Sequence, residues 1–594
     1  MLSRVRQFLL GGALAVVLAG SPTSKALAQQ VGAPSSGPEP GHTAPDISNQ
    51  IPPARPSPPP LAAPMAAGGC PFAGQGLRVT IVKVIVDGAT VVTPGEVAAA
   101  AAPFLDRPQD LSVVCRIRDR IARLFVRKGY RLTRVDLPAQ RITGGELHLA
   151  ATEGFIADID AKGLARMGPA AALASAYLAE AVGKRPTPWE DIERAVLLTR
   201  DIPGAEIGIR LHAVHGPPGA VELEADAERR RRLDVSTGVQ HLGSDELGPT
   251  ALYARFDANS FTRFGERTSL VLFASTNWAQ RVVEFNEEAN LGTQGLKGEF
   301  EINYAQTHPQ GALAPLQIDG DFLSTRTGLS YPFLRDQVLN IVGGVHFETI
   351  DDDNDLGLFR GLPTGAPTLF KDRLRIATGQ LELRWLPEDA LPLSFNVRAE
   401  IRQGLGGLGS SHEGDANLSR AQGDPQATVV RGDGSLRWTF GGRPAPDHMG
   451  GPWIELRGAA QWASGPVLAY EQFQIGNYTI GRGYSPGAAS GDRAVGGQFE
   501  AGWPIAFPPK QPVSRGSPLW FEPYAFYDTA YVTNLGVGGY SATIASAGAG
   551  VRARLPWQLN LDVAWADPLD PPFPGAAKPP GRLLLTLGRV FSFR

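Results

Sequence analysis

The C-terminal part of the chain consists of short stretches in which apolar and polar residues alternate. From the basic run Arg229 to Arg232 onward, such stretches of roughly 8 to 12 residues are separated by clusters of Gly, Asn, Asp and Pro. Successive side chains of a strand point to opposite faces, so this period predicts β-strands. Sixteen strands can be marked, beginning near Leu233, Thr250, Thr268, Arg281, Lys297, Gly320, Gln337, Arg373, Leu393, Thr428, Trp453, Val495, Leu519, Ser546, Leu559 and Arg582.

The final stretch indicates what surrounds these strands. One of its faces is large and apolar, comprising Leu583, Leu585, Leu587, Phe591 and Phe593, whereas the other is smaller and more polar. A lipid-exposed strand of a closed barrel requires this pattern, because a barrel satisfies every backbone group inside the membrane. A soluble sandwich can show the same alternation, so a second observation is needed. Arg594 follows Phe593, which makes the aromatic C-terminus slightly irregular.

The N-terminus supplies that observation. Arg4 and Arg6 precede an apolar run from Phe8 to Ala19, and Ala26-Leu27-Ala28 has the small-x-small pattern of a signal-peptidase site. We expect cleavage after Ala28 and export, because the run is too short to cross a bilayer as a helix. Export together with the aromatic C-terminus favours a transmembrane barrel over a soluble sandwich.

Composition separates the exported chain into parts. Residues 29–76 are dominated by Pro, Ala, Gly and Ser, which predicts a flexible or polyproline linker. Residues 77–155 and 156–228 then each show the order β-α-α-β-β, and residues 229–594 form the predicted barrel. The net charge of −3 gives no general attraction to nucleic acid.

Landmarks within the two modules support this order. We expect a strand from Leu77 to Val86, a helix opening at Thr93-Pro94 and a second helix from Ser112 to Lys128. Strands are expected from Arg131 to Leu137 and from Glu146 to Thr152. In the second module we expect a first helix around Pro169 to Ala181, a second from Pro188-Trp189 with Ile192 and Val196 buried, and strands from Ala205 to His212 and Ala220 to Ala225.

The chain contains two cysteines, Cys70 and Cys115. An oxidising compartment allows them to form a disulfide, which would close a loop of about 46 residues and stabilise the fold by about 4 kcal/mol. The alternative is two separate buried thiols.

Several motifs resemble the transporters of two-partner secretion, the TpsB class, whose POTRA-plus-barrel superfamily includes BamA. Residues Leu77 to Gly154 are similar to their first POTRA module, including Arg127-Lys128-Gly129-Tyr130 and Leu137-Pro138-Ala139-Gln140. Asp201-Ile202-Pro203-Gly204 resembles the end of their second module. The barrel part adds Tyr331-Pro332-Phe333, the run Ala545 to Arg552 and, most specifically, Gly481-Arg482-Gly483-Tyr484.

The resemblance implies a tether inside the barrel. In such transporters the Arg-Gly-Tyr motif sits on a long extracellular loop folded into the lumen, where the arginine pairs with the aspartate of a Phe-x-Asp strand motif. Carried over, Arg482 is the cation, Asp528 the anion, and Gly483, Tyr484 and Phe526 flank them. A solvent-exposed hairpin arginine is the alternative. Some relatives begin with a pore-plugging helix, but residues after Ala28 are too rich in proline to place one.

The resemblance also implies a partner. An unfolded secreted protein, with an N-terminal secretion domain and a β-helical body, would add to exposed POTRA sheet edges. By analogy these edges contain Arg131, Leu132, Thr133, Arg134 and Val135, and Ala205, Glu206, Ile207, Gly208 and Ile209. Other expected partners are outer-membrane lipid and the barrel-assembly machinery. The expected location is the outer membrane of a Gram-negative bacterium, with the POTRA modules in the periplasm.

Enzyme chemistry finds no support in the motifs. The sequence contains no Walker loop and no His-Glu-x-x-His or Cys-x-x-Cys spacing. Asp351, Asp353 and Asp355 are spaced like the start of a calcium loop, but Leu362 occupies the glutamate position. We therefore expect no catalytic residue, metal or cofactor. Two alternative functions remain open: an insertase, whose relatives usually carry more POTRA modules, and a passive porin, which needs none.

Overall fold

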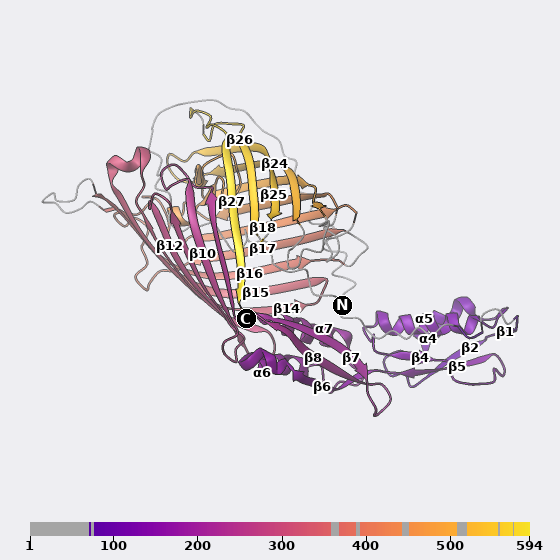
Figure 1. Cartoon of the computed structure of the whole chain (residues 1–594). Coiled ribbons are helices and arrows are strands. Elements are labelled where there is room, and N and C mark those ends of the chain that lie inside the picture. Colours follow the sequence, from indigo (N-terminus) through magenta and orange to yellow (C-terminus); the bar gives the residue numbers. More distant parts are fainter. Residues whose placement is uncertain are drawn as a thin grey trace. The chain divides into compact units, whose positions relative to one another are not determined.

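The computed structural model describes residues 70–72, 76–357, 368–387, 392–441, 451–507, 519–555, 557, 559–573 and 575–593. The predicted signal peptide, 1–28, and nearly all of the predicted linker, 29–76, lie outside these residues. Figure 1 shows two small modules in which helices cover one face of a sheet, and a large barrel.

The first module is a POTRA fold with one extra small sheet. Strands β2, β5 and β4 form its main sheet in the order β2-β5-β4, and β1 pairs with β3. Helix α5 buries Val114, Ile117 and Ile121 against this sheet, as its apolar spacing predicts. The elements are β1 Arg78–Thr80, β2 Lys83–Asp87, α4 Pro94–Ala101, η1 Ala102–Phe104, β3 Pro108–Asp110, α5 Val113–Arg127, β4 Arg134–Asp136 and β5 Glu146–Thr152.

The start of α4 follows from local chemistry. Thr93 caps the helix, its side chain accepts from the Glu96 backbone, and Pro94 occupies the first turn. Lys128 Nζ donates to Glu96 Oε2 at 2.8 Å, and this bond, with those from Thr93, lowers the pKa of Glu96 to about 2.

Two predictions for this module are wrong in detail. The stretch from Leu77 to Val86 is two strands, β1 and β2, in different sheets. The chain turns between them because Ile81 is buried in the core and the Val82 and Lys83 N–H groups donate to Gly145 O. The predicted strand from Arg131 to Leu137 shrinks to β4, Arg134–Asp136, since Arg131 and Leu132 lie in a turn closed by the Thr133 N–H and Tyr130 O.

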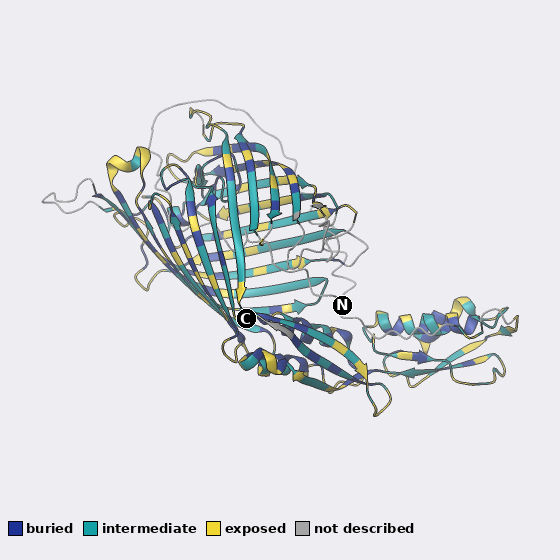
Figure 2. Ribbon diagram, in the orientation of Figure 1, coloured by how far each residue is buried: buried dark blue, intermediate teal, exposed yellow. Residues whose placement is uncertain are grey.

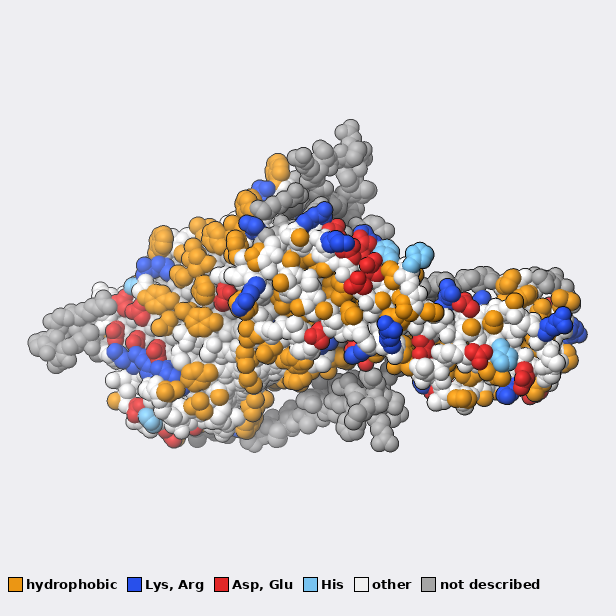
Figure 3. Space-filling model, turned by 90° about the horizontal axis from the view of Figure 1, so that it is seen from below, with side chains coloured by type: hydrophobic (Ala, Val, Ile, Leu, Met, Phe, Trp, Pro, Cys, Tyr) orange, Lys and Arg blue, Asp and Glu red, His pale blue; other side chains and the backbone are white. Residues whose placement is uncertain are grey.

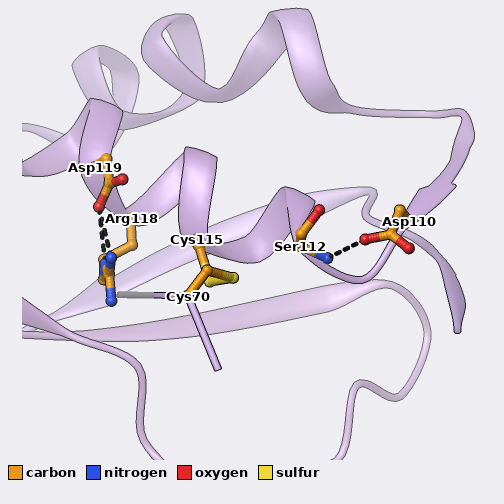
Figure 4. Close-up of a disulfide and its surroundings, with 6 residues drawn as sticks. All are labelled: Cys70, Asp110, Ser112, Cys115, Arg118 and Asp119. Carbon is orange, nitrogen blue, oxygen red and sulfur yellow. Dashed lines mark hydrogen bonds and ion pairs between the residues drawn. A yellow bond between two sulfur atoms is a disulfide. The ribbon is translucent and has the colours of Figure 1, made fainter. Parts of the chain in front are cut away.

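Cys70 and Cys115 are joined by a disulfide (Figure 4). Cys115 lies on α5, and Cys70 lies in the segment before β1. The bond therefore attaches that segment to the helix core of the first module. Nearby, Ser112 at the start of α5 donates its backbone N–H to Asp110 Oδ1 at 2.9 Å.

The second module has the order β-α-α-β-β, with a sheet in the order β6-β8-β7. Ile192 and Val196 on α7 are buried in its core, as predicted. The first helix starts later than expected, because residues 164–170 form a 3₁₀ segment. None of the helices within the described ranges is long and apolar enough to cross a membrane. The elements are β6 Phe155–Gly163, η2 Leu164–Ala170, α6 Ala171–Ala179, α7 Trp189–Arg200, β7 Ala205–Ala213 and β8 Ala220–Arg230.

The described residues beyond the modules form a closed antiparallel barrel of sixteen strands, in which β22 and β23 are two parts of one strand paired with β24. Each predicted start lies within five residues of an observed one. The strands are β9 Leu233–His241, β10 Thr250–Asn259, β11 Arg267–Ser275, β12 Gln280–Leu291, β13 Leu296–Thr307, β14 Ile318–Arg335, β15 Leu339–Leu356, β16 Thr368–Trp385, β17 Leu393–Gly404, β18 Thr428–Thr439, β19 Trp453–Ala463, β22 Arg493–Gly502, β23 Ile505–Phe507, β24 Leu519–Thr533, β25 Ser541–Leu555, β26 Leu559–Pro568 and β27 Arg582–Phe593.

The two faces of the barrel wall differ in chemistry, and buried and exposed residues alternate along the strands (Figure 2). Figure 3 shows hydrophobic side chains gathered over the barrel surface. Large apolar residues that point outward include Leu252, Leu270, Leu329, Val345, Leu381, Ile401, Leu456 and Leu583. Buried polar residues that point inward include Ser236, Gln240, Ser269, Asn303, Ser324 and Thr378.

Exposed aromatic residues mark both ends of the apolar surface. The end where β27 finishes carries Phe261, Phe333, Trp438, Trp503 and Phe593, and the opposite end carries Trp278, Trp462, Tyr531 and Trp565. Aromatic girdles of this kind lie at the two interfaces of a bilayer. The outer face of the wall therefore contacts hydrocarbon, and the inner face is polar.

Which face of the wall contacts lipid can be tested by introducing one charged residue. Val345 is 63% exposed near the middle of the apolar outer face of β15. Val345→Arg should lower the free energy of unfolding in lipid by about 2 to 4 kcal/mol, since it places a cation in hydrocarbon. Thr276→Arg, in the exposed turn between β11 and β12, should lower it by no more than about 1 kcal/mol. Equal losses in urea titrations of lipid-reconstituted protein would contradict the assignment of the outer face.

Candidate functional site: a loop held inside the barrel

The segment between β19 and β22, residues 464–492, is called here the lumenal loop. It contains η5 Ala469–Glu471 and a small hairpin of β20 Phe473–Ile475 and β21 Ala489–Gly491. Ile475, Ile480 and Tyr484 of this loop pack against inward-pointing apolar residues of the wall, namely Ala494, Ala530, Val532, Ala542 and Ile544. The loop is therefore folded into the barrel interior.

Arg482 at the loop tip meets Asp528 on β24 through three nitrogen atoms. Arg482 Nη2 lies 2.7 Å from Asp528 Oδ1, while Arg482 Nε and its backbone N lie 2.9 Å from Asp528 Oδ2. Asp528 is fully buried, and the Arg482 side chain is 15% exposed. Such a bidentate, charge-assisted contact is strong and geometrically specific. The structure brings together the two residues that the sequence motifs paired.

Aromatic and glycine residues fit the same contact. The Arg482 guanidinium lies 3.6 Å from the centre of the Phe526 ring, a cation–π arrangement. Tyr484 is fully buried, with its hydroxyl 2.9 Å from Ala545 O and 2.7 Å from Asp570 O. It also accepts from the Asp570 N–H at 3.2 Å.

Glycine is required on both sides of Arg482. Gly481 has a φ of +116°, and a Cβ there would lie 2.4 Å from Ile544 Cδ1. A Cβ at Gly483 would lie 2.7 Å from Pro568 N and 2.9 Å from Ser546 Cβ. At Gly481 the positive φ disfavours any other residue, and at Gly483 a side chain would collide with the backbone of the wall.

The sequence motifs did not assign two charged wall residues to this contact, although the run Ala545 to Arg552 includes the second of them. Glu500 on β22 accepts from Arg482 Nη1 at 2.6 Å, and its other oxygen lies 2.7 Å from Arg552 Nη1 on β25. Arg552 also contacts Glu522 at 3.2 Å and Asp562 at 3.3 Å. The one available signal was position: Glu500 lies opposite Phe526 in the β22–β24 register, on the inward face. The tip arginine therefore joins a charge network extending over four strands.

Seven of the ten residues expected to bind a client fall at two sheet edges. β4 pairs with β5 alone in the order β2-β5-β4, and β7 lies at the end of β6-β8-β7. Arg134 and Val135 are on β4, and Ala205, Glu206, Ile207, Gly208 and Ile209 are on β7. Arg131, Leu132 and Thr133 precede β4. Arg131 lies 5.2 Å from the Trp189 ring and Leu132 packs on the second module's core, so these residues belong to a module contact.

The β7 edge has its charges paired. Arg210 Nη2 and His212 Nε2 each lie 2.7 Å from the Glu224 carboxylate on β8. The hydrogen bond from Arg210, followed by that from His212, lowers the pKa of Glu224 to about 2. Because these charges are paired with one another, binding at β7 would depend on its main-chain groups more than on charge.

Within the described ranges, no three His, Cys, Asp or Glu side chains are placed to share a metal ion. Asp351 and Asp353 instead lie beside arginines, with Asp351 2.9 Å from Arg375 Nη1 and Asp353 2.7 Å from Arg373 Nη1.

Comparison with known proteins agrees with this architecture. Residues 79–154 match the family model "POTRA domain, ShlB-type". The outer membrane transporter CdiB of Escherichia coli O6:K15:H31 is 29% identical over 89 residues, which is 15% of each chain. The matched segment is therefore a small part of that relative.

Solved structures match over much more of the chain. The structure of CdiB from Escherichia coli has a TM-score of 0.68 at 17% identity, covering 89% of this chain and 94% of the other. That of CdiB from Acinetobacter baumannii has a TM-score of 0.59 at 13% identity, covering 86% and 90%. At these identities the likeness establishes the fold.

The fold and the matched module define a class: POTRA modules joined to a closed outer-membrane β-barrel. The barrel lies in the outer membrane and the POTRA modules lie in the periplasm. Within this class, the first module is ShlB-type and the whole fold is that of CdiB, as in the TpsB class.

A double-mutant cycle tests the contact at the loop tip. Arg482→Ala leaves Asp528 buried without its cation, and Asp528→Ala leaves Arg482 without its main acceptor. Each should lower thermal stability, and the double variant should lose less than the sum, with a coupling above about 1 kcal/mol. Arg263→Ala, in the exposed turn between β10 and β11, is the control and should be additive with Asp528→Ala. Additivity of the Arg482 and Asp528 variants would contradict the pairing.

Proposed function

We propose that the chain is an outer-membrane transporter that binds an unfolded protein through its POTRA modules and secretes it through the barrel. The observation that carries this proposal is a polar-lined, closed barrel whose interior holds a loop fixed by Arg482 and Asp528. The ShlB-type module and the fold of CdiB support the same reading. The client class is a large exoprotein with an N-terminal secretion domain and a β-helical body.

Capture of the client begins at the sheet edges. An extended chain can add as a further strand to β4 or β7, because edge strands present unpaired N–H and C=O groups. Binding of this kind depends on main-chain hydrogen bonds and suits a client that has not folded. The paired charges beside β7 are consistent with recognition that does not depend on client charge.

Passage then uses the lumen. The sequence has no nucleotide-binding loop of the Walker type. Folding of the client outside the cell supplies the driving force in this proposal, since a folded segment cannot return. The lumenal loop sets the arrangement through which the client passes. Lipid around the barrel and the barrel-assembly machinery during biogenesis complete the proposed partners.

Insertion of other barrels is the alternative function for this architecture. The seam between the last and first strands is paired at nine positions, from Leu585 with His241 to Phe593 with Leu233. This continuous seam favours passage through the lumen over release through the wall. Deleting the gene separates the functions: loss of one large secreted protein supports export, and broad loss of outer-membrane barrels supports insertion.

The tether should be needed for export. Arg482→Ala and Asp528→Ala should each reduce secretion of the client strongly while leaving the barrel inserted in the membrane, because the loop loses its contact with β24. Arg263→Ala should secrete normally. Immunoblots of culture medium and outer-membrane fractions measure both quantities. Normal export by both tether variants would remove the Arg482–Asp528 pair from the mechanism.

Client binding can be mapped with a photo-crosslinking residue. Placed at Arg134 on β4 or at Arg210 on β7, it should capture the client during export, because both are exposed positions on strands at the end of their sheets. Lys162 on β6, at the opposite edge of the second sheet and 92% exposed, is the matched control. Crosslinks at Lys162 alone, or at none of the three, would contradict capture at β4 and β7.

A further inference from the structure

The lumenal loop contacts the wall at its root as well as at its tip. Leu468 and Tyr470 lie at the root, and Tyr470 stacks on Phe322 of β14 with ring centres 5.4 Å apart. Both residues belong to an apolar cluster with wall residues of β10 to β16 that include Ala251, Phe273, Val282, Ala305, Ile350 and Ile376. This packing places the next residue, Glu471, against a different sector of the wall from the one that Arg482 reaches.

Glu471 there meets a buried arginine. Arg402 on β17 donates from Nη2 to Glu471 Oε1 at 2.8 Å and from Nε to Oε2 at 3.1 Å. The exposed fractions of the two side chains are 4% and 7%. A bidentate pair this deeply buried fixes both position and orientation, because a guanidinium presents its donors in a rigid fork.

Wall residues complete the surroundings of Arg402. Glu348 Oε2 on β15 lies 2.8 Å from Arg402 Nη2, and Glu400 Oε1 lies 2.9 Å from Nη1. Arg431 on β18 donates to the Glu471 backbone oxygen at 3.0 Å and lies 3.7 Å from its carboxylate. The cations of Arg402 and Arg431 both face Glu471. The negative charge of this loop carboxylate is therefore compensated by two arginines of the wall.

We propose that Arg402 and Glu471 are positioning residues that hold the root of the lumenal loop on the β15–β18 wall, so that Arg482 can reach Asp528 on β24. The loop is then braced between two sectors of the barrel, and the root contact and the tip contact support each other. The consequence for export rests on the proposed function, whereas the brace itself is a property of the isolated barrel.

The two members of the pair differ in what their loss does. Removing Arg402 would leave Glu348, Glu400 and Glu471 close together without their shared cation, which is expected to damage the barrel itself. Glu471→Gln removes the negative charge from the loop, while Arg402 stays paired with Glu348 and Glu400. Arg402→Lys keeps a cation for the wall carboxylates but cannot form the two-nitrogen contact with Glu471. These two milder substitutions therefore weaken the contact between loop and wall, while a cation remains beside the wall carboxylates.

A buried cysteine can report whether the loop stays in place. Ala489 on β21 is 5% exposed and lies in the apolar contact between loop and wall. Cys70 and Cys115 are bonded to each other, so a cysteine in place of Ala489 is the reactive thiol. The measurement is its labelling rate with a membrane-impermeant maleimide, in full-length protein in lipid without any client, beside the melting temperature of the barrel.

In the Ala489→Cys background, Glu471→Gln and Arg402→Lys should each speed labelling by about tenfold, which corresponds to about 1.4 kcal/mol of lost docking energy, with the melting temperature unchanged. Glu413→Gln, in the exposed loop between β17 and β18, is the matched control and should label like the parent. Unchanged labelling in both test variants would overturn the proposal. Faster labelling accompanied in both test variants by a clear fall in the melting temperature of the barrel would also overturn it, since that result indicates general destabilisation. Because no client is present, failure of the export function would leave this result unaffected.

Discussion

The structure depends on one constraint: within hydrocarbon, each backbone N–H and C=O must find a partner in the protein. A sheet meets that requirement only when its first and last strands pair, as β9 and β27 do. Closure then forces each strand to present one face to lipid and the other to an enclosed space. The outward row of Leu583, Leu585 and Leu587 and the inward polar residues of neighbouring strands are two consequences of this single geometry.

Enclosure also gives the charges inside the barrel their importance. Arg482, Arg552 and Arg402 are each surrounded by carboxylates and largely removed from bulk water, so their pairings are geometrically defined. An exposed pair of the same residues would contribute little. The lumenal loop forms buried ion pairs at its root and at its tip, and two glycines at its tip allow the approach to the wall.

The sequence predicted the barrel well because its signal is periodic. Sixteen stretches with a period of two give strand starts within a few residues, and a large apolar outer face identifies the environment. Strands of three residues are too short to show a period, so β3 was missed and β1 was merged with β2 into one predicted strand. Arg482 and Asp528 could be paired from motifs, but Glu500, Arg552 and the Arg402–Glu471 contact could not. These contacts depend on how strands distant in sequence are aligned, and alternation along one strand does not reveal that alignment.

The closed, polar-lined barrel is occupied by its own loop. Single-channel recording of purified protein in planar bilayers can measure this occupancy, by comparing the full chain with a variant that lacks residues 473–490. We expect low conductance for the full chain and a stable, much larger conductance for the shortened one, because the loop fills the lumen. Equal conductance of the two proteins, with both inserted and folded, would contradict it.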